Sequence, residues 1–219
     1  MKTKSNAFKG SFAFSLSICV FLFYSCEEKI VKAEISPLQK QEVKITNQII
    51  IVIQPFSDIP EEYVKYVYDE LLNVYPNLEL KKTIPLPKTA YYSPRKRYRA
   101  DSLINYLSTI TDAGHVTIGL TSKDISATKD QYADWGIMGF GFCPGKACVA
   151  STFRLSKTDL LSQFFKVAIH ELGHTQDLNH CPVKTCFMRD AEGKNLTGEE
   201  KEFCPKCKAV LVEKGWKFN

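Results

Sequence analysis

The sequence predicts an α/β domain built on a twisted, mixed but mostly parallel β-sheet with helices packed against it. Three observations favour this class. Continuous β-branched runs, typical of strands buried on both faces, alternate along the chain with segments of helical periodicity. The order strand–helix–strand–helix–strand places helices over a parallel sheet. The 219 residues are 44% hydrophobic and 12% aromatic, which is enough for a packed core in one domain.

The domain opens with the strand Ile49–Ile53, an uninterrupted β-branched run. A helix is expected next, because Asp58 is a favoured N-cap residue, Pro60 suits the first helical turn and two acidic residues follow. Apolar residues then recur at helical spacing up to Leu72. The next expected elements are a strand at 78–84, a helix at 99–110 and a strand at 115–120.

Two further strand-like runs, 137–143 and 148–153, predict a hairpin around the turn Pro144-Gly145-Lys146. Cys143 and Cys148 flank this turn, and they either form a small disulfide or remain unpaired. Residues 160–172 carry apolar side chains around most of the helix circumference, which predicts a largely buried helix.

The N-terminal segment has the features of an export signal. Three lysines precede the apolar run Phe12–Tyr24, which is short for a membrane span but suits a signal-peptide core. Ser25 and Cys26 follow, which resembles the small residue and the lipidated cysteine at the end of bacterial lipoprotein signals. An uncleaved anchor and a simple secretory signal are the alternatives.

The expected organisation follows from that interpretation. It comprises a signal peptide (1–25), a lipidated cysteine with a tether (26–47) and a folded domain (48–219). Acyl chains on Cys26 would anchor the exported protein to a bacterial membrane, in the periplasm or at the cell surface.

Charge argues against a nucleic-acid partner. The formal net charge is +5, and removing the first 25 residues, which hold three lysines and no acidic residue, leaves +2. The basic run 95–99 contains a tyrosine, but it comes directly before the expected helix at 99–110. We interpret it as a solvated junction between a loop and a helix, so we expect no nucleic-acid partner.

The strongest chemical signal lies in the helix at 160–172 and just beyond it. His170 and His174 are four residues apart, so both imidazoles lie on one helix face and can bind one metal ion. Glu171 is rotated by about 100° from His170 and can reach a metal-bound water instead. A buried helix with two core histidines is the alternative interpretation.

His180 supplies a third imidazole if the chain turns back after His174. Three histidines would leave the fourth tetrahedral position open to water, which is the catalytic arrangement of zinc.

Four cysteines close the sequence pattern. Their spacing, Cys-x4-Cys followed by Cys-x-x-Cys, is typical of a tetrathiolate zinc site. Because exported cysteines normally oxidise, two disulfides are the alternative. The four are Cys181, Cys186, Cys204 and Cys207.

The whole string from His170 to Cys207 resembles the signature of the archaemetzincins, a branch of the metzincin metallopeptidases; Asp177 stands where that signature has glycine. The glycine implies a sharp turn with positive φ, and Asp is among the non-glycine residues that tolerate this conformation best. We therefore expect a strained but formed turn at Asp177; loss of the third ligand is the alternative. The resemblance implies a metzincin-like zincin domain with a C-terminal four-cysteine zinc-bound segment. It implies two Zn²⁺ ions, one catalytic and one structural, with Glu171 as general base. Met188 would form an apolar floor beneath the catalytic site. The implied ligands are His170, His174 and His180 for the first zinc and Cys181, Cys186, Cys204 and Cys207 for the second.

The resemblance further implies zinc-dependent hydrolysis of peptide bonds in a peptide or protein substrate. The strand at 148–153 is expected to bind the substrate backbone by strand addition. The alternative function is a non-catalytic, zinc-stabilised surface binding protein, in which Asp177 marks a relaxed active site.

Overall fold

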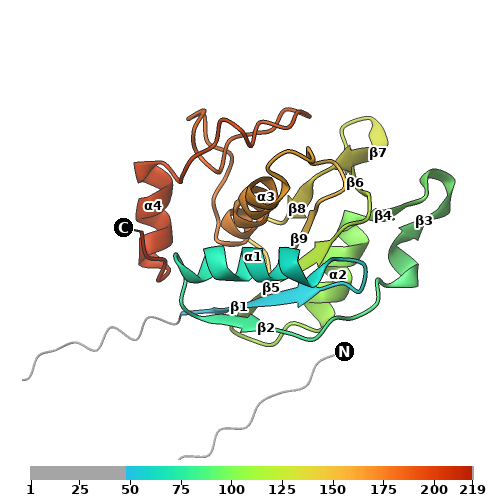
Figure 1. The fold of residues 1–219 in the computed structure, drawn as a ribbon, viewed down its shortest axis with the longest axis horizontal. Helices are drawn as coiled ribbons and strands as arrows, with labels where there is room; N and C mark the ends of the chain where they lie inside the picture. Colours follow the sequence, from blue (N-terminus) through green and yellow to red (C-terminus); the bar gives the residue numbers. More distant parts are fainter. Residues whose placement is uncertain (1–47, 219) are drawn as a thin grey trace, which may run out of the picture. The chain divides into compact units, whose positions relative to one another are not determined.

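The computed structural model describes residues 48–218 (Figure 1). The predicted signal peptide (1–25) and the predicted lipidated cysteine and tether (26–47) lie outside the described residues. Within residues 48–218, none of the helices has both the length and the hydropathy needed to span a bilayer.

The main sheet has five strands, of which four run parallel and the last, β8, is antiparallel at one edge. This confirms the predicted mixed, mostly parallel sheet. The strands in spatial order are β2 (Leu78–Leu80), β1 (Ile50–Pro55), β5 (His115–Thr121), β9 (Ala147–Ser151) and β8 (Gly139–Gly141).

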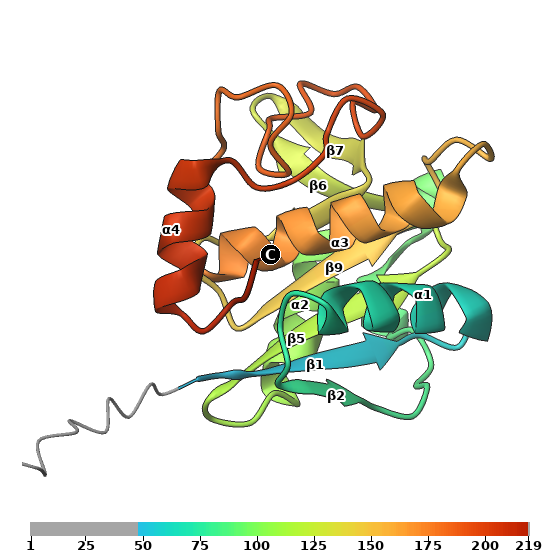
Figure 2. The same cartoon turned by 60° about the vertical axis from the view of Figure 1, so that its left-hand side comes forward.

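Helices cover both faces of this sheet, because alternate strand residues point to opposite sides. On one face, Cys148 and Ala150 join the core beneath α1 and α3. On the other face, Ala147 and Val149 pack with the residues of α2. Figure 2 shows α1 and α3 side by side over the strands. The helices are α1 (Glu61–Leu72), α2 (Ala100–Thr109), α3 (Leu160–Thr175) and α4 (Pro205–Glu213).

A second, four-stranded sheet was not predicted. Its strands in spatial order are β3 (Tyr91–Tyr92), β4 (Arg97–Arg99), β6 (Ile125–Lys129) and β7 (Tyr132–Ile137). In Figures 1 and 2, β6, β7 and the loops between α3 and α4 lie on the same side of α3. The region between these segments and α3 contains the candidate site.

The predicted strands and helices are confirmed as elements, with shifts at their ends. One local interpretation was wrong: Asp58 does not cap α1, whose N-cap residue is Pro60. The Asp58 carboxylate instead accepts hydrogen bonds from the Thr121 hydroxyl at 2.8 Å and the Ser122 amide at 2.6 Å. Asp58 therefore ties the chain before α1 to the end of β5.

The predicted hairpin is confirmed as β8 and β9, but the strand expected to bind substrate is the wrong one of the pair. Ala150 of β9 lies opposite Leu120 of β5 and also opposite Gly139 of β8. Both edges of β9 are therefore occupied by neighbouring strands, so a substrate cannot pair with it. On this side the sheet ends at β8, so within the hairpin the outer edge of β8 is the one left for strand addition.

The basic run 95–99 is a solvated junction only in part: Arg95 and Lys96 are exposed ahead of α2, but Arg97 is buried, so the interpretation was wrong for Arg97. Arg97 lies in β4 with its side chain only 10% exposed. Its guanidinium is 3.0 Å from the Asp124 carboxylate and 3.5 Å from that of Asp134. Asp124 also accepts two hydrogen bonds from Arg154, at 2.8 and 3.0 Å. The buried charges pair with one another and join β4, β6, β7 and the end of β9.

Replacing Asp124 by alanine should lower the free energy of unfolding by about 3 kcal/mol, because Arg97 and Arg154 lose a partner in a largely buried site. Denaturant unfolding monitored by circular dichroism measures this. The matched control is Asp69→Ala, which removes an exposed pair with Lys65 and should change the free energy of unfolding by about 0.5 kcal/mol or less. Equal effects of the two substitutions would contradict a stabilising role for the network.

Candidate active site

The buried helix α3 carries two imidazoles toward one point. Phe164, Ala168 and Leu172 fix the helix in the core. His170 and His174 project from the opposite side of these contacts, with their Nε2 atoms 3.0 Å apart. Two nitrogens on a tetrahedral zinc, each about 2.0–2.1 Å from the ion, would lie about 3.3 Å apart. The pair is therefore spaced for a shared metal ion.

The chain reverses directly after α3 through a hydrogen-bonded helix end. The Leu178 amide donates to the Gly173 carbonyl at 3.1 Å, and the Asp177 amide donates to the His174 carbonyl at 2.9 Å. These are the two bonds of a Schellman motif, in which a left-handed residue, usually glycine, follows the last turn. Asp177 has φ of 72°, so the predicted left-handed turn is confirmed.

The reversal brings His180 to the other two imidazoles. The ring centre of His180 lies 4.9 Å from that of His174 and 5.4 Å from that of His170. One nitrogen from each of the three rings lies within 4.8 Å of the others. The alternative in which Asp177 prevents the third histidine from joining is not what the structure shows.

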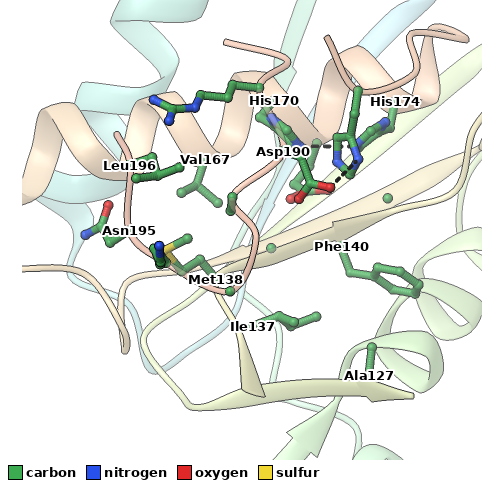
Figure 3. Close-up of a pocket in the computed structure, with 18 of the residues that line it drawn as sticks. Ala127, Ile137, Met138, Phe140, Val167, His170, His174, Asp190, Asn195 and Leu196 are labelled. Atoms are coloured by element: carbon green, nitrogen blue, oxygen red, sulfur yellow. Dashed lines mark hydrogen bonds and ion pairs between the residues drawn. The ribbon is translucent and has the colours of Figure 1, made fainter. Parts of the chain in front are cut away.

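Each imidazole makes a polar contact through Nδ1. His170 Nδ1 donates to the Phe187 carbonyl at 2.5 Å, and His174 Nδ1 donates to the Leu178 carbonyl at 2.8 Å. His180 Nδ1 is 3.4 Å from the Asp190 carboxylate, which Figure 3 shows beside His170 and His174. A carbonyl only accepts, so the first two rings carry hydrogen at Nδ1 and leave Nε2 for a metal.

Burial sets the charge of the central residues. Burial and the neighbouring His174 imidazole lower the pKa of His170 to about 3, and burial also lowers the pKa of His174. Both rings are therefore neutral at physiological pH, the form that binds a metal. In the metal-free site, burial raises the pKa of Glu171 to about 8, because the ionised carboxylate loses solvation. A dication held by the neighbouring histidines would lower this pKa and favour the ionised form that a general base needs.

The four predicted cysteines converge on a second point. The Sγ atoms of Cys181 and Cys204 are 3.7 Å apart, and those of Cys186 and Cys207 are 3.8 Å apart. Two thiolates at about 2.3 Å from a tetrahedral zinc lie about 3.8 Å apart, so these separations fit one shared ion. All six cysteines within residues 48–218 are free. The two-disulfide alternative is therefore wrong, and Cys143 and Cys148 are unpaired.

The segment around Met188 connects the two clusters. The Met188 carbonyl accepts from the Cys181 amide at 2.7 Å, next to His180, while its amide donates to Cys186 Sγ at 3.5 Å. The Met188 side chain is fully buried, and its sulfur packs against α3 at Gly173, where any side chain would collide with it. Met188 therefore packs against the helix that carries His170 and His174, and its carbonyl binds the chain next to His180. Its role as an apolar floor stays a prediction.

A cavity of about 670 Å³ opens onto the histidines and is lined by residues of β6, β7, β8, α3 and the loop after Met188. Glu171 lines it together with His170, His174 and His180. Figure 3 shows Val167, Met138 and Leu196 forming an apolar side of the cavity. Trp135 of β7 also lines the cavity.

Sequence reasoning missed Asp190 and the cavity wall formed by β6 and β7. Asp190 had a weak signal, because it is an acidic residue two positions after Met188, in the segment already assigned to the site. Trp135 had none, since its place at the cavity depends on pairing between strands of the second sheet.

A histidine pair on a buried helix, a third histidine after a sharp turn and a glutamate in the same cavity define a zinc-dependent peptidase. The model of Peptidase family M54 matches residues 40–213, and this chain belongs to that family. It is 31% identical over 163 residues to the archaemetzincin of Methanopyrus kandleri, covering 73% of this chain and 89% of that protein. It is 28% identical over 173 residues to that of Halobacterium salinarum, covering 73% and 97%.

Comparison with solved structures identifies the same family as comparison of sequences. The crystal structure of the Methanopyrus kandleri archaemetzincin superposes with a TM-score of 0.65 at 28% identity, covering 78% of this chain and 98% of that chain. The archaemetzincin from Archaeoglobus fulgidus shares the fold, with a TM-score of 0.63 at 24% identity over 74% and 99%. The protein is a zinc metallopeptidase, and the non-catalytic alternative is not favoured.

Exchanging Asp177 tests whether the turn needs a residue that tolerates positive φ. Asp177→Gly should keep the free energy of unfolding within about 1 kcal/mol, because relief of left-handed strain offsets the larger entropy of the unfolded chain. Asp177→Val should destabilise by more than about 1 kcal/mol and weaken metal binding at the histidines, since a branched Cβ disfavours this conformation. Denaturant unfolding and zinc titration measure both. A valine variant as stable as the parent would show that the turn tolerates any residue.

Proposed function

We propose that the chain hydrolyses peptide bonds with Glu171 as general base and with His170, His174 and His180 as ligands of the catalytic zinc. The observation that supports this is the convergence of the three imidazoles and the Glu171 carboxylate on one cavity. When bound, zinc supplies a Lewis acid that polarises a peptide carbonyl and lowers the pKa of water.

The protein side chains transfer the proton and orient the metal ligands. Glu171 follows His170 in the helix and projects about 100° away from it, so its carboxylate is directed past the imidazoles. It accepts a proton from the attacking water at Oε1 or Oε2 and returns it to the amine that leaves. The Phe187 and Leu178 carbonyls hold the rings of His170 and His174, and Asp190 holds that of His180.

The substrate backbone would bind along β8 rather than β9. β8 is the edge strand of the main sheet, and Met138, Gly139, Phe140 and Gly141 line the cavity. An extended peptide added to this edge would run beside Glu171. Its side chains would then reach the apolar wall formed by Val167, Met138 and Leu196.

The cysteine cluster would hold a second, structural zinc. Four thiolates without an open position give the closed site of structural zinc. Amides of Met188 and Cys204 donate to Cys186 Sγ at 3.5 and 3.3 Å, which stabilises a thiolate there. This ion would hold Cys181 in place and with it the neighbouring His180.

Export and lipid attachment at Cys26 belong to the same proposal and are supported by the sequence alone. The basic start, the apolar run Phe12–Tyr24 and the cysteine after Ser25 support a lipoprotein signal. The folded peptidase would then act at the surface of a bacterial membrane or in the periplasm.

Glu171→Gln separates catalysis from binding, because glutamine keeps the shape of the side chain but does not accept the proton. Hydrolysis of a peptide library should fall by about 10²–10⁴-fold, the usual contribution of general base catalysis, with zinc content unchanged. The control is Glu62→Gln, an exposed residue of α1. Undiminished hydrolysis by the Glu171 variant would remove Glu171 from the mechanism.

Zinc content tests the two sites separately. The purified chain, kept reduced, should hold two zinc ions by elemental analysis. His170→Ala should lose one ion, Cys204→Ser should lose the other, and Cys143→Ser should retain both, because Cys143 lies outside either cluster. A single ion that survives His170→Ala would mean that the histidines bind no zinc.

A further inference from the structure

The edge strand β8 has glycine at two of its three positions, on either side of Phe140. Glycine weakens a strand, because it gains little from packing and loses much backbone freedom. Two glycines in a strand usually mark a place where another group comes very close. Since residues two apart point to the same face of a sheet, Gly139 and Gly141 face one neighbour.

That neighbour is Glu171. A Cβ added to Gly139 would lie 2.5 Å from Glu171 Oε1, 2.6 Å from its Cγ and 2.8 Å from its Cδ. A Cβ added to Gly141 would lie 2.8 Å from the Glu171 backbone oxygen and 3.4 Å from Oε2. All these separations except the last are too short for real carbon contacts. The Glu171 side chain therefore occupies a notch that the two glycines leave in β8.

Gly139 and Gly141 are needed for their missing side chains and not for an unusual backbone conformation. Neither has φ in the left-handed region, in contrast to Gly114, Gly193 and Gly215, whose φ values are 75°, 76° and 90°. An alanine at 139 or 141 would suit the local backbone, so its effect would come from the contact with Glu171.

We infer that Gly139 is a positioning residue for the general base: its missing side chain lets the Glu171 carboxylate lie against β8, beside the edge where substrate binds. This inference rests on the proposed function, since it assigns a role to Glu171. Gly141 sets the distance between β8 and α3, because its own close contact is with the Glu171 backbone.

The two glycines differ in what an added methyl group would displace. At Gly139 it meets only side-chain atoms of Glu171 (Oε1, Cγ and Cδ), so a change of the Glu171 rotamer would relieve the contact without moving backbone. At Gly141 it meets helix backbone and also Cys148 Cβ at 3.2 Å, so the strand itself would have to move. Gly139→Ala therefore separates the position of the carboxylate from the stability of the fold.

The test compares Gly139→Ala with Gly198→Ala in the full chain loaded with zinc, using the best substrate from a peptide library. Gly198 has no atom within 4 Å of an added Cβ and no positive φ, so it controls for the substitution itself. We expect kcat to fall by about 100-fold for Gly139→Ala, the usual effect of displacing a catalytic group by about 1 Å. KM and zinc content should stay within about threefold of the parent.

A second comparison separates displacement of the carboxylate from a general structural defect. Glu171→Asp retracts the carboxylate from the notch, which makes room for a methyl group at 139. The Gly139→Ala substitution should then cost less than about fivefold in kcat in the aspartate background, against about 100-fold in the parent. Equal losses in the two backgrounds, or a Gly139→Ala variant with parental kcat, would overturn the inference while leaving the proposed function intact. A parent chain that hydrolyses no peptide would overturn both.

Discussion

The catalytic centre depends on the reversal of the chain at the end of α3. A helix presents imidazoles four residues apart from one direction only, so a third ligand must come from chain that has turned back. The Schellman bonds of Asp177 and Leu178 make this turn within three residues of the helix end at Thr175. The Leu178 carbonyl also accepts the Nδ1–H of His174. The residues that end the helix therefore also orient one ligand and direct the chain toward His180.

The two metal-binding clusters form one structural unit. The Phe187 carbonyl accepts a hydrogen bond from His170, and the Met188 carbonyl accepts one from the Cys181 amide. The Asp190 carboxylate lies next to the His180 ring. These contacts all come from one short segment between the second and third cysteines. Filling the cysteine site would fix this segment, because metal binding contributes directly to the stability of the chain that supplies the ligands. A metal ion bound by the four cysteines would then also help to hold the histidines in place.

Local sequence signals predicted the parts of the fold that depend on local chemistry. The helix that carries His170 and the buried first strand were predicted from adjacent residues, whereas the left-handed turn at Asp177 was predicted from the family signature, which has glycine there. The errors arose where the structure depends on distant partners. From the sequence, Arg97 was expected to be solvated, because nothing near it in the chain shows that the second sheet places Asp124 and Asp134 beside it. Periodicity identified the β8–β9 hairpin but could not show which strand ends the sheet, since strand order depends on long-range pairing.

Two departures from local backbone preference meet at the catalytic centre, and they are of opposite kinds. Asp177 is a residue with a Cβ where the helix end favours glycine, and Gly139 and Gly141 are glycines where a strand favours side chains. Each departure costs roughly 1 kcal/mol. The buried core around α3 and β9 can offset such losses, because burial of apolar residues there does not depend on these positions. A short edge strand offers little length for extended pairing with a second copy of the chain, whereas the proposed substrate backbone would need only the few residues of β8 beside Glu171.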